Sequence, residues 1–185
     1  NFSVCALGDT SYELFCESGK EWDNRFEQLG ASRLVARVDC DVDYDKPAAE
    51  WGEKALAHMA AVDGTGSFQE AMVETISSFV QSGGVAEASA PVAEASASTD
   101  SETSGSLEMD GDRSIHILFG SQSGNAEGLA AKIGKRAEAF GLVSTVHDMD
   151  GFDISSLSSM SRVLIVCSTW GEGEQPDNAE ELWQS

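Results

Sequence analysis

The hydrophobic pattern of residues 113–185 predicts strands that alternate with helices. Two strongly apolar runs, each followed by a polar loop, have the length of buried strands. A shorter apolar run and segments with helical spacing lie between them and after them. The predicted elements are strand 115–119, helix 127–140, strand 142–147, a helix start or turn at 153–157, strand 163–167 and a final helix capped by Asp177 or Asn178.

Residues 1–80 follow the same alternation. Short apolar runs predict strands at 2–7 and 34–39. Apolar residues at helical spacing predict three helices: one with Trp22, Phe26 and Leu29 that ends at Gly30, one from Pro47 through Met59, and one over 68–80. Strands that alternate with helices predict an α/β fold, a doubly wound parallel sheet with helices on both faces.

Residues 81–112 differ in composition from both flanking parts. They are mainly Gly, Ala, Ser, Val and acidic residues, and they include no aromatic and no basic residue. Such a segment buries too little apolar surface to offset the entropy lost on ordering, so we predict a flexible acidic linker. The expected organisation is therefore residues 1–80, a linker at 81–112 and residues 113–185.

The formal net charge of −21 narrows the possible partners. Like-charge repulsion disfavours nucleic acid and anionic membrane surfaces, and no apolar run is long enough to cross a membrane. A partner protein with a basic surface is favoured, although solubility or adaptation to salt explains the charge equally well. The four cysteines show no C-x-x-C spacing, which indicates neither a disulfide framework nor a zinc site and fits a reducing cytoplasm.

The loop after the strand at 115–119 has the features of a phosphate site. It lies between a strand and a helix, where backbone N–H groups lack intrahelical partners and the helix dipole is positive. Ser121, Ser123 and Asn125 add side-chain donors, and Gly124 permits a close approach of the backbone. No Lys follows in the pattern of a nucleoside-triphosphate loop, so a single phosphate is the favoured ligand.

Three more loops follow predicted strands, at 8–16, 39–45 and 168–178. Ligands of open parallel sheets bind at the carboxyl ends of the strands, so these loops and the phosphate loop are expected to meet. Trp170 and Tyr12 come from different loops and could enclose a planar ring. Singly, each aromatic residue is more typical of packing, but together with a phosphate loop they favour a flat, phosphate-bearing cofactor.

Three motifs resemble the FMN-binding loops of flavodoxin-like domains. They are S-Q-S-G-N-A from Ser121, S-T-W-G-E-G-E-Q-P-D-N-A from Ser168 and L-G-D-T-S-Y-E-L-F-C from Leu7. The chain is most similar to the diflavin reductases, and especially to the flavoprotein subunit of NADPH-sulfite reductase, because R-V-D-C-D-V-D-Y precedes a helix with Trp51. The resemblance covers about 1–62 and 113–185.

This resemblance implies a set of cofactor-binding residues. Those that would hold the FMN phosphate are Ser121, Gln122, Ser123, Gly124, Asn125 and Ala126. Trp170 and Tyr12 would lie against the two ring faces, with Tyr12 the more secure of the two. The remaining residues implied around the ring and ribityl chain are Ser168, Thr169, Gly171, Gly173, Leu7, Gly8, Asp9, Phe15, Cys16 and Asp39.

The resemblance also implies electron transfer as the function. In the family, electrons pass from NADPH through FAD to FMN, and then to an acceptor such as the sulfite reductase haemoprotein. FAD and NADPH would bind to modules that this chain lacks, so the chain would belong to an oxidoreductase without turning over alone. No Ser/His/Asp or Cys/His triad is apparent. The alternatives are a flavin-free interaction module and an inert truncated fragment.

The motifs occur in an unusual order. Residues 113–185 correspond to the first three strands of a flavodoxin-like domain, and residues 1–62 correspond to the last two. The chain is therefore expected to be a window from tandem domains, which its cut-looking ends favour, or a circular permutant. In either case we predict that the halves form one five-stranded sheet in the order 2-1-3-4-5.

Overall fold

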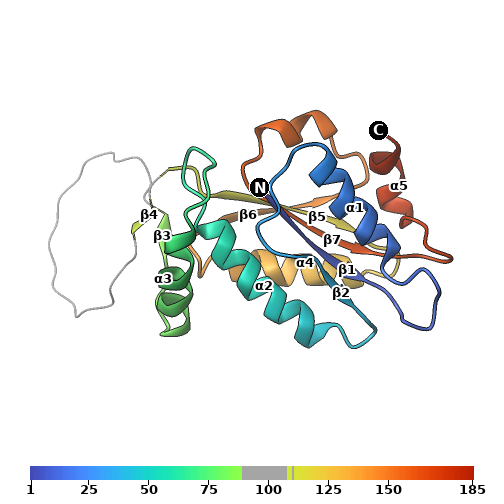
Figure 1. Ribbon diagram of the computed structural model, residues 1–185, viewed down its shortest axis with the longest axis horizontal. Helices are drawn as coiled ribbons and strands as arrows, with labels where there is room; N and C mark the ends of the chain where they lie inside the picture. Colours follow the sequence, from blue (N-terminus) through green and yellow to red (C-terminus); the bar gives the residue numbers. More distant parts are fainter. Residues whose placement is uncertain (89–107, 110) are drawn as a thin grey trace, which may run out of the picture.

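Five parallel strands form one sheet in the order β2-β1-β7-β5-β6 (Figure 1). The computed structural model describes residues 1–88, 108–109 and 111–185. The strands are β1 (Phe2–Leu7), β2 (Val38–Cys40), β5 (Ser114–Gly120), β6 (Val143–Asp148) and β7 (Val163–Ser168). Counted from β5, this is the order 2-1-3-4-5, so the prediction of one flavodoxin-like sheet assembled from two chain halves is confirmed.

The two halves meet where β1 pairs with β7. Their register runs from Phe2 opposite Val163 to Leu7 opposite Ser168. β7 also pairs with β5 on its other side, so it is the central strand of the sheet. Central parallel strands are covered on both faces, which explains why the run 163–167 is apolar throughout and buried.

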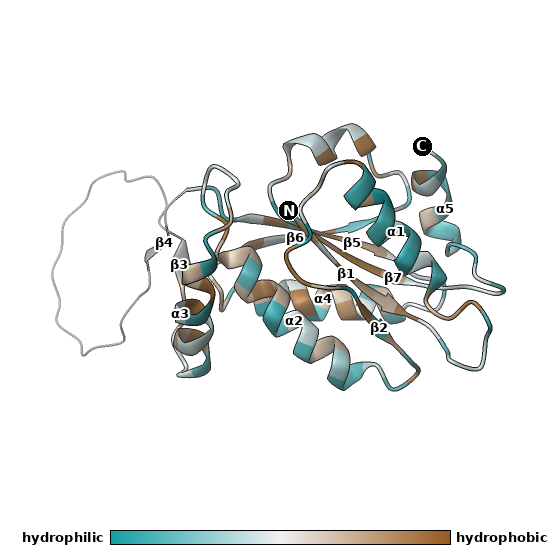
Figure 2. Cartoon of the chain, in the orientation of Figure 1, coloured by the Kyte–Doolittle hydropathy of each residue, from teal (hydrophilic) through white to brown (hydrophobic). Residues whose placement is uncertain are grey.

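Helices cover both faces of the sheet (Figures 1 and 2). One face packs against α2 (Asp45–Ala60) and α4 (Asn125–Ala137), with α3 (Glu70–Gln81) beside α2. The other face packs against α1 (Glu17–Gln28), α5 (Asp177–Gln184) and the 3₁₀ helix η1 (Ile154–Ser159). Figure 2 shows the apolar residues concentrated along the strands and the inner sides of the helices.

Each face has its own hydrophobic core. The α2/α4 core includes Trp51 and Ile133, and the α1/α5 core includes Trp22 and Phe26, all buried. Each core combines side chains from both halves of the chain. The hydrophobic effect therefore joins the halves on both faces, although both halves are acidic.

Two buried arginines join the halves at the amino-terminal end of β5 and β7. Arg162 is fully buried, and its Nε donates to the carbonyl of Met59 at 2.9 Å. Arg113 donates from Nη1 to the carbonyl of Ala60 at 2.9 Å, and both guanidinium groups donate to the carbonyl of Val62. The last carbonyls of a helix lack intrahelical partners and carry partial negative charge, so two cations are well placed there.

The strand predicted at 34–39 is wrong in its extent, because β2 contains only Val38–Cys40. Before it, the backbone N–H of Leu34 donates to the carbonyl of Phe2, and that of Val35 donates to the hydroxyl of Ser3. A side chain thus takes the place of a ladder partner. The edge position of β2 permits this, since only one of its sides pairs with a strand.

The predicted cap of the last helix is also wrong. Pro176 is the N-cap residue, and neither Asp177 nor Asn178 caps α5. Instead, the Asn178 carboxamide accepts a hydrogen bond from the N–H of Ser121 at 2.8 Å, and Asp177 accepts one from the side chain of Gln122. These two side chains fix the neighbouring loop.

The linker predicted at 81–112 falls mainly on residues 89–107 and 110, which lie outside the described residues. Among the described residues of that range, β3 (Glu87–Ala88) pairs in parallel with β4 (Glu108–Met109), and Ala86 forms a bridge with Phe140. The linker and the division at 1–80, 81–112 and 113–185 therefore remain predictions.

Candidate functional site

A cavity of about 540 Å³ lies at the carboxyl ends of β1, β5 and β7. Loops from both halves of the chain enclose it. The predicted site residues that line it are Leu7, Gly8, Asp9, Tyr12, Phe15, Cys16, Gln122, Ser123, Asn125, Ser168, Thr169, Trp170 and Gly171. The structure therefore brings together the loops at 8–16, 120–126 and 168–178, as the sheet topology requires.

Four of the predicted residues shape the loops without lining the cavity. Ser121 accepts a hydrogen bond from the N–H of Ala126 at 3.2 Å, which closes the phosphate-type loop on itself. Gly124 has a φ of 85° and Gly173 a φ of 110°, a region that favours glycine. A side chain at Gly173 would also clash with Leu14, because a Cβ there would lie 2.7 Å from Leu14 Cδ1.

Asp39 does not line the cavity. Its carboxylate forms an ion pair with Arg37, with Nε and Oδ1 2.6 Å apart. Along β2 the side chains alternate, and the neighbouring Cys40 is the one that points into the core. In the structure, Asp39 is therefore paired with Arg37 and lies outside the cavity wall.

Three further residues line the cavity: Leu14, Val42 and Tyr44. Sequence reasoning did not single them out. Val42 and Tyr44 belong to the motif R-V-D-C-D-V-D-Y, so their place after β2 was the available signal. The apolar surface of Val42 and Tyr44 makes the cavity wall less polar than the three loop motifs alone suggest.

The loop at 120–126 offers free donors to the cavity. Gly124 is the N-cap of α4 and has no side chain to satisfy the first helical amides. Among the described residues, the backbone N–H groups of 122–125 donate to no protein acceptor. Together with the Ser123 and Asn125 side chains, they form a concentrated set of donors at the positive end of a helix.

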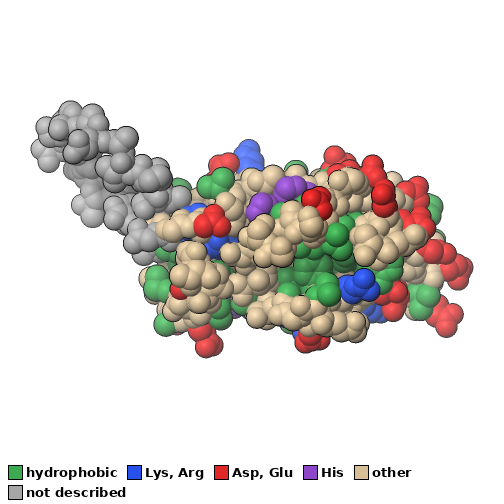
Figure 3. Space-filling model, turned by 90° about the horizontal axis from the view of Figure 1, so that it is seen from above, with side chains coloured by type: hydrophobic (Ala, Val, Ile, Leu, Met, Phe, Trp, Pro, Cys, Tyr) green, Lys and Arg blue, Asp and Glu red, His purple; other side chains and the backbone are tan. Residues whose placement is uncertain are grey.

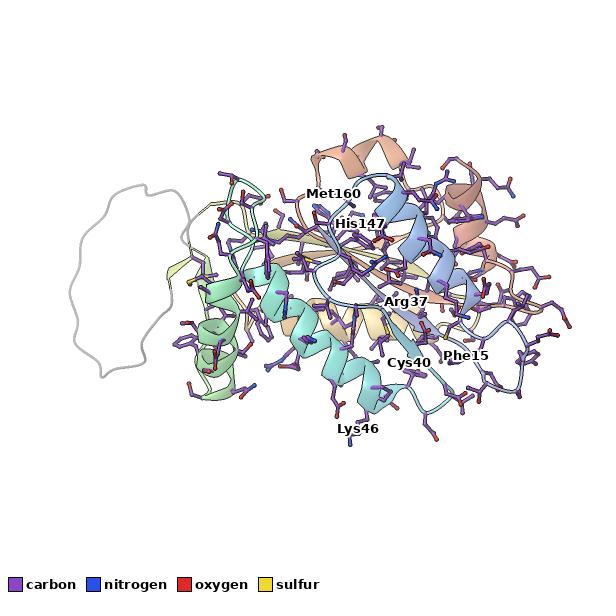
Figure 4. The ribbon with its side chains drawn as sticks, viewed as in Figure 1. Phe15, Arg37, Cys40, Lys46, His147 and Met160 are labelled. Carbon is purple, nitrogen blue, oxygen red and sulfur yellow. The ribbon has the colours of Figure 1, made fainter. Side chains whose placement is uncertain are left out.

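Tyr12 and Trp170 are the prominent aromatic residues of the cavity. They come from different halves of the chain, and their side chains are 56% and 52% exposed. Exposed aromatic residues at the edge of a cavity are typical of binding sites rather than of packing. Figure 4 shows Phe15 and Cys40 at this same end of the sheet.

The loop that carries Trp170 is fixed from within and from α1. Reciprocal hydrogen bonds join the backbones of Trp170 and Glu174, at 3.0 and 2.8 Å. The hydroxyl of Ser18 donates to the carbonyl of Glu174 at 2.8 Å, and the indole of Trp22 donates to Gln175 at 2.9 Å. A helix from one half therefore positions a cavity loop from the other.

The loop at 8–16 packs closely against β2. The N–H of Gly8 donates to the carbonyl of Cys40 at 2.9 Å, and a Cβ at Gly8 would lie 2.9 Å from the nitrogen of Cys16. Burial, with the nearby charge of Asp39, raises the pKa of Cys16 to about 12. A thiol with so high a pKa is protonated at neutral pH.

Acidic side chains surround this end of the molecule. Figure 3 shows them gathered at the end opposite the grey atoms, which is the end where the cavity loops lie. Within the described ranges, no group of three or more His, Cys, Asp or Glu residues is placed to hold a metal ion. None of the described helices has the length and hydrophobicity to cross a membrane.

Comparison with known proteins identifies the family. The family model that matches is that of flavodoxin, over residues 1–52 and 117–185. The chain belongs to the flavodoxin family. Both halves contribute to the match, in agreement with the sheet that they share. Membership of this family, together with the flavoprotein relatives described next, indicates FMN as the cofactor and electron transfer as the role.

The relatives are flavoprotein subunits. The chain is 66% identical over 55 residues to the sulfite reductase [NADPH] flavoprotein alpha-component of Bacillus subtilis, a match that covers 30% of this chain and 9% of the relative. The corresponding proteins of Photobacterium profundum and Klebsiella pneumoniae are 51% identical over 65 residues and 53% identical over 60 residues. These two matches cover 35% and 32% of this chain, and 11% and 10% of those relatives.

The cavity fits FMN in three respects. Unpartnered amides at the start of α4 suit a phosphate, and two exposed aromatic side chains suit a flat ring. The volume of about 540 Å³ is within the range of cofactor pockets.

Proposed function

We propose that this chain is the FMN-binding electron-transfer domain of a diflavin reductase of the sulfite reductase type. It would receive electrons from an FAD- and NADPH-binding module and pass them to an acceptor such as the sulfite reductase haemoprotein. The observation that carries this proposal is the single cavity that combines free donors at a helix start with Tyr12 and Trp170. The flavoprotein relatives support the sulfite reductase version.

The cavity residues divide into three roles in this proposal. The amides of 122–125, with Ser123 and Asn125, would hold the phosphate. Tyr12 and Trp170 would lie against the ring, and Leu14, Val42 and Tyr44 would exclude water from it. FMN, once bound, supplies the redox chemistry, whereas the protein binds and orients it.

The charge of the site sets a direction for the reduction potential. Glu172 and Glu174 belong to the loop of Trp170, and Asp9 lines the cavity. Carboxylates oppose the addition of negative charge to a bound ligand, because like charges repel. They should therefore lower the reduction potential of the bound flavin. The same charges would steer an acceptor with a basic surface, and salt would screen that attraction.

Both halves of the chain would belong to one domain. We propose that residues 113–185 supply its first three strands, that residues 1–80 supply the last two strands and a trailing helix, and that residues 81–112 connect them. A tandem-domain window and a circular permutant both remain compatible with this organisation. A cytoplasmic location is likewise a proposal, which the four free, buried cysteines support.

Titration of the purified chain with FMN tests the proposed function. Flavin fluorescence should be quenched at one equivalent of FMN per chain, since the aromatic side chains would contact the ring. Riboflavin, which lacks the phosphate, is the matched control and should bind much more weakly. Unquenched fluorescence with a folded protein, as seen by far-UV circular dichroism, would favour the flavin-free interaction module instead.

A further inference from the structure

The carboxylate of Asp41 connects two loops of the cavity, those at 8–16 and 39–45, through hydrogen bonds. Asp41 accepts two hydrogen bonds from Thr10: Oδ1 accepts from the backbone N–H at 3.0 Å, and Oδ2 accepts from the hydroxyl at 2.5 Å. Oδ1 also accepts from the N–H of Val42 at 2.8 Å. These bonds stabilise the charged form and hold the pKa of Asp41 below its ordinary value.

The two residues joined by this contact lie next to cavity-lining side chains. Thr10 is between Asp9 and Tyr12, and Asp41 is followed by Val42 and then Tyr44. Within the first loop, Asp9 accepts from the N–H and hydroxyl of Ser11, and the N–H of Tyr12 donates to the carbonyl of Asp9 at 3.1 Å. Thr10 lies inside this turn, so a contact that holds Thr10 also holds the turn that carries Tyr12.

The loop at 8–16 is also attached to the end of β2 at its two ends. The N–H of Gly8 and the thiol of Cys16 both donate to the carbonyl of Cys40, at 2.9 and 3.6 Å. Among the described residues, the segment from Asp9 to Tyr12 makes no hydrogen bond outside itself other than those of Thr10 to Asp41. A loop that is already ordered loses less conformational entropy when it binds a ligand.

We propose that Asp41 is a positioning residue of the cofactor site, which holds the loop at 8–16 so that the Tyr12 ring faces the cavity before the ligand arrives. This inference rests on the proposed FMN function. Asp41 and Thr10 are at the surface and belong to neither hydrophobic core. Loss of the contact should therefore affect ligand binding far more than global stability.

Asp41→Ala in the 185-residue chain tests the proposal, with Asp43→Ala as the matched control. Both variants remove one carboxylate from the same loop, but among the described residues Asp43 accepts no hydrogen bond. By fluorescence quenching, Asp41→Ala should raise the Kd for FMN about tenfold, and Asp43→Ala less than about twofold. Equal changes would show that only charge matters and would overturn the proposal.

Two further variants separate the hydrogen bonds from the charge. Thr10→Ser keeps both donors, so it should bind FMN like the unaltered chain. Thr10→Val keeps the shape but loses the hydroxyl, so it should weaken binding. A Thr10→Val variant with unchanged affinity would contradict the proposed contact.

A double-mutant cycle identifies the residue through which Asp41 acts. In a Tyr12→Ala background, Asp41→Ala should have almost no further effect on the Kd for FMN, whereas independent roles would make the two effects additive. Additive effects would overturn the assignment to Tyr12.

Amide hydrogen exchange of the apoprotein separates this proposal from the FMN assignment. In Asp41→Ala, the amides of 10–12 should exchange at least several times faster, while the amides of β7 keep their protection. Unchanged exchange at 10–12 would overturn the positioning role even if FMN binds. Failure of the unaltered chain to bind FMN would refute the proposed function and leave the exchange result to decide the loop contact.

Discussion

The two ends of the sheet join the halves of the chain in opposite ways. At the amino-terminal end of β5 and β7, Arg113 and Arg162 are buried and donate to the carbonyls that end α2. At the carboxyl end, loops from both halves meet around an open cavity, and hydrogen bonds from Ser18 and Trp22 connect α1 to the loop of Trp170. The first end has its polar groups satisfied by the protein, whereas the second keeps donors and aromatic faces available.

This difference suggests that the two ends of the sheet have different roles, one in stability and one in ligand binding. Burial and the charge of Arg162 lower the pKa of Arg113 to about 10, so this side chain remains protonated at neutral pH. Burial also lowers the pKa of Arg162. Removal of a buried, charged donor leaves several carbonyls without a hydrogen-bond partner, which strongly lowers the free energy of unfolding. Loss of an exposed cavity side chain has no such cost. The side chains that matter for stability should therefore be those of the arginine end, whereas the side chains of the loop end should matter for ligand affinity.

The largest expected effect is on stability, from Arg162→Met. This change keeps much of the side-chain volume but removes the donors to Met59 and Val62, and it should lower the free energy of unfolding by about 3 kcal/mol. Lys46→Met is the control, because the Lys46 ammonium is 86% exposed and only 3.8 Å from Glu50, a weak surface pair. Urea unfolding measures both. A similar stability for the two variants would contradict the proposal that the arginine end of the sheet determines stability.

The next effect is on affinity, from Tyr12→Ala. Loss of one aromatic face should weaken FMN binding by about 1–2 kcal/mol, roughly tenfold, with little change in the urea midpoint. Val85→Ala is the control, since Val85 is also exposed, at 57%, but lies in the range 81–112 far from the cavity. Fluorescence quenching gives both affinities. Equal affinities would defeat the stacking assignment.

Gly124 and Gly128 offer a matched pair at the loop end. A Cβ at either position would meet no atom within 4 Å, but Gly124 has a φ of 85° and Gly128 lies inside α4. Gly124→Ala should therefore cost about 1–2 kcal/mol of stability, whereas Gly128→Ala should gain up to about 1 kcal/mol. Urea midpoints that shift in the same direction would show that backbone conformation does not govern this loop.

The smallest effect concerns two histidines between the two ends. The Nδ1 of His116 on β5 lies 3.0 Å from the Nε2 of His147 on β6. Figure 4 labels His147. Burial lowers the pKa of both, and their mutual repulsion lowers that of His116 further. A base with a lowered folded-state pKa stabilises the protein above its unfolded pKa of about 6.5, and that contribution is lost as the pH falls.

The free energy of unfolding should thus fall by less than about 1 kcal/mol between pH 7.5 and pH 5.5, and the urea midpoint should fall with it. The effect is small because both rings are partly exposed. His147→Gln should flatten this part of the pH profile. An unchanged profile in that variant would show that other groups cause the dependence.

The sequence predicted the features that depend on local pattern. The apolar runs at 115–119 and 163–167 and the motifs around Tyr12 and Trp170 lie where the alternation of strands and helices placed them. The rule that ligands bind at the carboxyl ends of parallel strands brought these loops together without a structure. Each of these predictions follows from local sequence, without knowledge of which distant residues are in contact.

The features that were missed depend on long-range contacts. The burial of Arg162 follows from the packing of α2 against the strand ends, whereas a charged residue in sequence predicts exposure. Asn178 has a side chain typical of a helix cap, but in the structure its carboxamide accepts a hydrogen bond from the N–H of the distant Ser121. Asp39 was expected at the ligand, and its pairing with Arg37 depends on the irregular approach to β2.

The central claim is that one FMN site is built from both halves of the chain, and amide chemical-shift mapping tests it most directly. Addition of FMN to the isotope-labelled chain should shift the amides of three regions: 8–12 from one half, and 121–126 and 168–171 from the other. The amides around Arg113 and Arg162 should remain unchanged. Shifts confined to one half, or spread toward the arginine end, would contradict the account.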